Sequence, residues 1–119
     1  MTTSPTVTES PFDKVAEGVE LRTVRRHADR GTTFFVRMRK GAHAPRHGHP
    51  GGEETCVLEG ALRIEARVDE TGAAQPDVVV RAGEYVFAPP GETHEGVAIE
   101  DTLFFVVAAG GLVAARPPR

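Results

Sequence analysis

Apolar and polar residues alternate along much of the chain with the two-residue period of a β-strand. Residues 33–40 and 61–68 show this alternation over their full length. The apolar members are Phe34, Val36 and Met38 in the first segment and Leu62, Ile64, Ala66 and Val68 in the second. Successive side chains of a strand point to opposite faces, so both segments are predicted to be half-buried strands. Their arginine and glutamate residues, Arg67 included, are expected to face solvent.

Shorter apolar segments, separated by glycine, proline or aspartate, add further strands. They lie at residues 55–58, 78–81, 85–88 and 103–109. Many short strands with hardly any helix predict an all-β sandwich or barrel. The one exception is a possible short helical turn in residues 12–18, whose side chains tolerate helix.

A length of 119 residues fits one domain. Both ends carry proline and lack apolar periodicity, so we expect an N-terminal arm at residues 1–18, a barrel at residues 19–114 and a tail at residues 115–119. Residues 69–77, which are polar and contain Gly72 and Pro76, are predicted to form a hairpin loop.

Composition and charge exclude several classes of protein. A net charge of -3 argues against a nucleic-acid surface. No apolar stretch approaches the ~20 residues of a membrane span, and residues 1–10 do not resemble a secretion signal. A cytoplasmic location is therefore expected. The single cysteine, Cys56, cannot form an internal disulfide and is expected to pack in the core.

The strongest chemical pattern lies in residues 41–60. His47 and His49 are one residue apart, so on an extended chain both rings project to the same side and can meet one metal ion. Glu53 follows beyond the Pro50–Gly52 turn and can fold back to add a carboxylate oxygen. Glu54 is the alternative, because the turn interrupts strand alternation and side-chain parity alone cannot decide between the two.

A second pattern follows at residues 83–94. A strand is stopped by two prolines, Pro89 and Pro90, and turned at Gly91, after which His94 follows at once. Proline restricts φ and glycine tolerates unusual backbone angles, so this turn is expected to hold His94 in a defined place.

Together these two patterns resemble the motifs of the cupin superfamily. The first motif is matched at every fixed position, which are Gly41, His47, His49, Glu53 and Gly60. The second is matched at Gly83, Pro89, Gly91 and His94, while Ala98 stands where the family has asparagine. The resemblance implies a small jelly-roll barrel that holds one divalent metal ion on His47, His49, Glu53 and His94.

More narrowly, the segments around these motifs look like ChrR-type cupins and the dihydroxyacetophenone and acetylacetone dioxygenase group. The resemblance implies first an iron dioxygenase acting on a small carbonyl compound, with a zinc-binding, non-catalytic sensor as the alternative. A non-redox isomerase or lyase is a third possibility. Iron or zinc is the expected ion, with manganese or nickel as alternatives, and no general base is identified. A small-molecule ligand and a homodimer that covers a strand edge are also expected.

Other polar and aromatic residues near the motifs are expected to have structural or solvent-exposed roles. His27 and His43 are expected to be structural. Arg46, Glu92 and Glu95 flank the ligands and can orient them or contact a substrate, although a charge at a barrel mouth is usually just solvated. The aromatic residues expected to pack inside the barrel are Tyr85, Phe87, Phe104 and Phe105.

Overall fold

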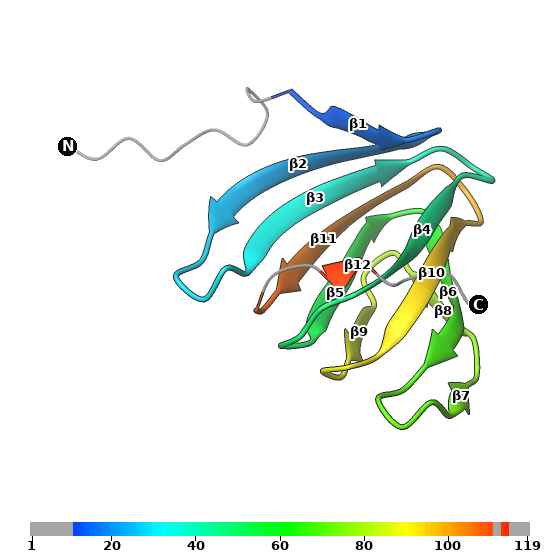
Figure 1. Ribbon diagram of the computed structural model, residues 1–119. Helices are drawn as coiled ribbons and strands as arrows, with labels where there is room; N and C mark the ends of the chain where they lie inside the picture. Colours follow the sequence, from blue (N-terminus) through cyan, green and yellow to red (C-terminus); the bar gives the residue numbers. More distant parts are fainter. Residues whose placement is uncertain (1–10, 111–112, 115–119) are drawn as a thin grey trace.

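The chain folds into two antiparallel β-sheets that face each other (Figure 1). The computed structural model describes residues 11–110 and 113–114. Among them are twelve strands and no helix, so no described helix could cross a membrane. The strands are β1 (Asp13–Ala16), β2 (Val19–Arg26), β3 (Thr32–Met38), β4 (His43–Gly48), β5 (Glu53–Glu59), β6 (Ala61–Val68), β7 (Ala74–Gln75), β8 (Val78–Arg81), β9 (Tyr85–Ala88), β10 (Thr93–Ala98), β11 (Thr102–Ala108) and β12 (Val113–Ala114).

The two sheets are built from different strands. The first has the order β1-β2-β3-β11-β5-β9, and the second has the order β12-β4-β10-β6-β7, with β8 also paired to β6. Neighbours in sequence are often not neighbours in the sheets, since β11 lies between β3 and β5, and β10 lies between β4 and β6. These crossovers close the two sheets around one core. The predicted all-β, single-domain jelly roll is confirmed.

Alternation along the strands builds that core. Val36 and Met38 of β3 face Leu62 and Ile64 of β6 across a cluster that also contains the fully buried Val57. Phe34 packs against the cluster from its edge. Burying one such side chain contributes about 1.5–3 kcal/mol, so the predicted inward positions supply much of the drive to close the sheets.

The predicted helical turn in residues 12–18 is wrong. Residues 13–16 form β1, which pairs with β2 in the register Asp13 with Leu21 and Ala16 with Val19. A single isolated helical turn is costly to nucleate, whereas the same residues gain ladder hydrogen bonds at a sheet edge. The sheet therefore begins within the predicted arm, while residues 1–10 and 115–119 lie outside the described residues.

A β-bulge changes the expected facing of the second half of β6. Thr93 of β10 pairs with Val68 and Glu95 pairs with Glu65, so two residues of β6, Ala66 and Arg67, lie opposite one residue of β10. Ala66 has a φ of 52° and is exposed instead of buried. Alternation fails here because an inserted residue reverses the faces of those beside it.

Candidate metal centre

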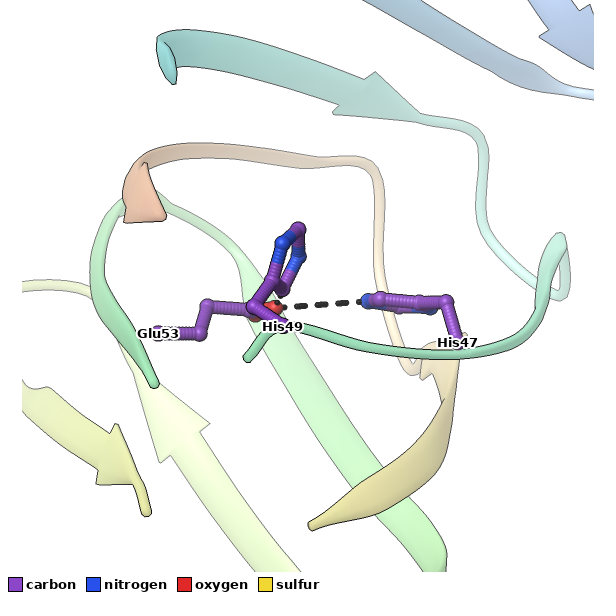
Figure 2. A group of neighbouring side chains, drawn as sticks. All are labelled: His47, His49 and Glu53. Carbon is purple, nitrogen blue, oxygen red and sulfur yellow. Dashed lines mark ion pairs between the residues drawn. The ribbon is translucent and has the colours of Figure 1, made fainter. Parts of the chain in front are cut away.

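Three strand segments deliver the four predicted ligands to one end of the core. β4 carries His47 and is followed directly by His49, β5 begins at Glu53, and β10 carries His94. His94 and His47 are cross-strand partners. Figure 2 shows the side chains of His47, His49 and Glu53 converging, with an ion pair between the His47 ring and the Glu53 carboxylate.

A tight turn brings Glu53 back toward the two histidines. Gly52 N–H donates to the His49 carbonyl at 3.1 Å, and Gly51 N–H donates to the Ala109 carbonyl at 3.0 Å, which fixes the turn against the end of β11. Gly52 has a φ of 89°, and a Cβ there would lie 3.0 Å from the Ala88 carbonyl oxygen. Only glycine meets both conditions without strain.

One carboxylate oxygen lies at the centre of the cluster. Glu53 Oε2 is 2.8 Å from Nε2 of His49, 3.4 Å from Nε2 of His47 and 3.6 Å from Nε2 of His94. Glu53, His49 and His94 are buried, while the His47 side chain keeps 27% of its surface exposed. The cluster is therefore reached from solvent on the His47 side.

His47, His49 and Glu53 form the tightest part of this cluster. Their candidate ligand atoms all lie within 4.8 Å of one another, the spacing of a metal-binding group. His94 stands outside that group of three, but its ring meets the His47 ring edge-on, with 4.7 Å between centroids. The structure thus brings all four predicted residues together, with His94 at the periphery.

The hydrogen bonds of the rings show why this donor set fits a cation. Nδ1 of His47 lies 2.8 Å from the Pro45 carbonyl oxygen, and Nδ1 of His94 lies 3.0 Å from a carboxylate oxygen of Glu92. Both partners can only accept, so each Nδ1 carries a hydrogen, and Nε2 is the ring nitrogen that remains available to a metal ion. Two imidazole nitrogens and a carboxylate oxygen that face one point form a donor set that a positive ion between them would stabilise.

The electrostatics of the metal-free site point the same way. Burial alone would raise the pKa of Glu53, but contacts with His47, His49 and His94 outweigh it and hold that pKa well below its usual value. Burial likewise lowers the pKa of His47, yet the Glu53 carboxylate and the Pro45 carbonyl raise it above its usual value overall. The site therefore keeps its carboxylate charged and attracts a positive charge.

The space beside the ligands is small. A cavity of about 30 Å³ is bounded by His47, Glu53 and His94, and its other walls are mostly apolar, including Met38 and Phe104. A larger hollow of about 700 Å³ lies at the end of the sheets near Glu20, Arg37 and Asp101, and none of the four predicted ligands lines it. The small cavity is therefore the one beside the candidate metal site, since His47, Glu53 and His94 line it.

Several other predicted residues lie away from the cluster. Glu54 points to the outer face of β5, where its Oε1 accepts the Tyr85 hydroxyl hydrogen at 2.8 Å. His43 Nε2 lies 2.9 Å from Glu95, and His27 Nε2 lies 2.7 Å from the Thr33 hydroxyl, so both fill structural roles.

Four of the packing expectations are wrong. Cys56 and Phe105 are only half-buried, and Tyr85 and Phe87 are exposed on the same outer face, whereas Phe104 packs in the core as expected. The alternation in residues 85–88 does not distinguish the two faces, because apolar side chains occupy both of them.

The contact of Glu92 with the site was only one of several expectations from the sequence, and the contact of Arg67 with Glu92 was not predicted. Glu92 is buried, in contact with His94, and not solvated at the barrel mouth. Its two-residue spacing from His94 was the available signal, since i and i+2 share a face of an extended segment. Nothing in the sequence indicated that the Arg67 side chain is largely buried, because its position in the alternation of β6 predicted a side chain that faces solvent.

Fold and site together define a cupin domain with a candidate metal site at His47, His49 and Glu53. Residues 3–113 match the ChrR cupin-like domain, and the chain belongs to this family. A curated relative, the DNA damage-repair/toleration protein DRT102 of Arabidopsis thaliana, is 29% identical over 97 residues, which are 82% of this chain. The chain spans 28% of the length of that relative.

Solved structures with low sequence identity share the fold. A chain in the complex of Rhodobacter sphaeroides SigE with the anti-sigma ChrR has a TM-score of 0.67 and 22% identity, covering 87% of this chain and 51% of that one. A candidate acetylacetone dioxygenase from Methylibium petroleiphilum has a TM-score of 0.77 and 14% identity, covering 98% and 83%. KdgF from Halomonas sp. has a TM-score of 0.71 and 21% identity, covering 98% and 96%.

Proposed function

We propose that this chain binds one divalent metal ion through His47, His49, Glu53 and His94. The observation that carries the proposal is the approach of three imidazole Nε2 atoms to the single oxygen Glu53 Oε2, at 2.8–3.6 Å. Imidazole and carboxylate ligands suit zinc and iron, and also manganese and nickel. The carboxylate lowers the net charge of a divalent ion in this buried site from +2 to +1, which makes its burial less costly.

Metal analysis of purified protein tests the site. We expect about one equivalent per chain in the native protein and loss of most of it in His49→Ala, because that ring lies closest to Glu53. His43→Ala is the matched control, since His43 lies on β4, which ends directly before His49, but contacts Glu95. Full metal content in His49→Ala, or equal loss in both variants, would contradict the assignment.

The size of the cavity guides the choice between enzyme and binding module. Pockets for drug-sized organic ligands span about 300–1,000 Å³, whereas the cavity beside this cluster holds about 30 Å³. A single water needs roughly 10–15 Å³ on the same measure. The site therefore suits an ion with one or two water-sized ligands, which favours a non-catalytic zinc-binding cupin that responds to a small ligand or oxidant.

A dioxygenase is the second candidate. The likeness in fold to the candidate acetylacetone dioxygenase supports it, as does a site that reaches solvent at His47. Bound iron would supply open coordination positions for a carbonyl compound and dioxygen. The chain's own residues would hold the ion and exclude water with the apolar wall that contains Met38 and Phe104. Such a substrate would require these walls to move apart.

Oxygen uptake separates the two candidates. Protein purified without air is loaded with Fe(II) or Zn(II) and mixed with diketone, hydroxyketone or thiol compounds. We expect zinc to be the ion retained on purification and the iron form to consume no oxygen beyond its own oxidation. Substrate-dependent oxygen uptake by the iron form would establish the dioxygenase instead. Conversion of a carbonyl compound without oxygen would indicate a non-redox isomerase or lyase.

A further inference from the structure

Two charged side chains, Arg67 and Glu92, lie on the side of the His94 ring opposite Glu53. Arg67 donates to both carboxylate oxygens of Glu92, from Nη2 to Oε1 at 2.9 Å and from Nε to Oε2 at 3.3 Å. The second of these oxygens also accepts from Nδ1 of His94 at 3.0 Å. The Arg67 and Glu92 side chains keep only 15% and 3% of their surface exposed. This hydrogen-bonded chain is therefore largely shielded from water.

The chain fixes which nitrogen of His94 carries the hydrogen. A guanidinium is always charged, and a carboxylate that it binds at both oxygens accepts hydrogen bonds and cannot donate one. Nδ1 of His94 must then donate to Glu92, which leaves Nε2, 3.6 Å from Glu53, as the nitrogen available to a metal ion. We infer that Arg67 and Glu92 are positioning residues, which hold His94 in the orientation and tautomer that a metal ligand needs.

The backbone is shaped to make this contact. The bulge at Ala66 places both Ala66 and Arg67 opposite His94, and it turns Arg67 inward where regular alternation would send it to solvent. Nη1 of Arg67 also donates to the Pro76 carbonyl oxygen at 2.8 Å. Arg67 is thus held at three nitrogens. It therefore holds the Glu92 carboxylate firmly beside Nδ1 of His94.

A matching irregularity lies on the other side of β10. His94 pairs with His47 and Gly96 pairs with Ala44, so β4 is also bulged, at Pro45 and Arg46. Arg46 Nη2 donates to the Ala66 carbonyl oxygen at 3.2 Å and so links the two bulges across β10. Both strands beside His94 therefore deviate from regular pairing at the level of the site.

This inference rests on the proposed metal site, so its test measures both. Removing Glu92 alone would leave the Arg67 charge poorly compensated in a largely buried position, and breaking a buried pair is strongly destabilising. The informative variant is Arg67→Leu with Glu92→Leu, which removes both charges. Zn(II) titration calorimetry should show about 10–100-fold weaker binding with unchanged stoichiometry, as is usual when a ligand histidine loses its outer partner. The matched control is Glu20→Leu with Arg37→Leu, a surface pair at 3.0 Å, which should bind zinc normally.

Nitrogen-15 NMR of metal-free protein supplies a readout independent of metal. His94 should carry its hydrogen on Nδ1 in the native protein and in the control with Glu20→Leu and Arg37→Leu. It should move toward the Nε2 tautomer in the double-leucine variant. Native His94 with its hydrogen on Nε2, or native zinc affinity in the double variant, would overturn the inference. Native protein that shows the Nδ1 tautomer but binds no zinc would overturn the metal site and leave the positioning of the ring intact.

Discussion

The adjacent carboxylates Glu53 and Glu54 differ completely in surroundings. Glu53 is buried among three imidazoles, while Glu54 is exposed and bound by the Tyr85 hydroxyl. We predict that Glu53→Gln loses most bound metal, because a neutral amide neither offsets the charge of the ion nor replaces an anionic ligand. Glu54→Gln, which makes the same chemical change one residue away, should keep native metal content. Elemental analysis of both variants checks this, and equal metal loss in the two would contradict it.

The sequence predicted which four side chains gather in the cluster, but not the residues that contact them from outside it. His47 and His49 could be paired because side chains two residues apart on an extended chain point the same way, whereas the preference for Glu53 over Glu54 and the addition of His94 came from the resemblance to the cupin motifs. The role of Glu92 depends on its burial, and burial depends on Arg67, which lies 25 residues earlier. A long-range pair of this kind leaves no local signal, since both residues would be ordinary surface charges in isolation.

At the level of elements, one inserted residue determines which way the side chains at the end of β6 point. The alternation of residues 61–64 continues into the core, but Ala66 adopts a φ of 52° and reverses the faces beyond it. Alanine carries no sequence mark of this conformation, unlike the glycines that occupy the other tight turns. The strands themselves were therefore predictable, whereas the register at the site was not. The register arises from pairing with β10.

The strain at Ala66 gives a prediction about stability. Left-handed backbone costs a non-glycine residue about 1–2 kcal/mol, and a β-branched side chain costs more. Ala66→Gly should therefore change the free energy of unfolding little, since relief of strain offsets the added flexibility of glycine. Ala66→Val should lower it by roughly 1–3 kcal/mol, measured by urea denaturation of metal-free protein.

Ala74→Val is the control for that comparison. Ala74 is also exposed and lies on β7, which pairs with the same strand, but its backbone shows no positive φ. Valine suits an exposed strand position, so this variant should be as stable as the native protein. If Ala66→Val proves equally harmless, the bulge does not depend on the left-handed residue.

At the scale of the whole molecule, the proposed ion joins the two sheets. Glu53 lies in the sheet that contains β5, β9 and β11, whereas His47 and His94 lie in the sheet that contains β4 and β10. We predict that saturating Zn(II) raises the melting temperature. An ion at about 100 times its dissociation constant adds about 2.7 kcal/mol, which corresponds to roughly 10–20 °C for a domain of this size. Differential scanning calorimetry with zinc and with a chelator checks this, and His49→Ala should show no such rise.

The outer face of the sheet that contains β3, β11, β5 and β9 has an apolar surface that no described element covers. Four cross-strand neighbours form one row across it, namely Phe35, Phe105, Cys56 and Tyr85. Leu58 and Phe87 extend the row and are 45% and 47% exposed. Contiguous exposed apolar surface of this kind marks an interaction site.

A second copy of the chain is the partner that we expect for this face. The charges beside the apolar row are already satisfied within the chain, since Arg37 pairs with Glu20 at 3.0 Å and Glu54 accepts the Tyr85 hydroxyl hydrogen. The same apolar face of a second copy, related by a two-fold axis, therefore suits it better than a charged partner. We expect a homodimer to form through this face, and not through a strand edge.

Light scattering after size exclusion tests the dimer. Leu58→Asp places like charges near each other in the buried interface and should yield monomers, because desolvating an unpaired carboxylate costs several kcal/mol. Val79→Asp is the control, since Val79 is similarly exposed, at 40%, but belongs to β8 of the other sheet. It should remain dimeric. A monomeric native protein would show that another molecule covers this face, and dissociation of both variants would place the interface elsewhere.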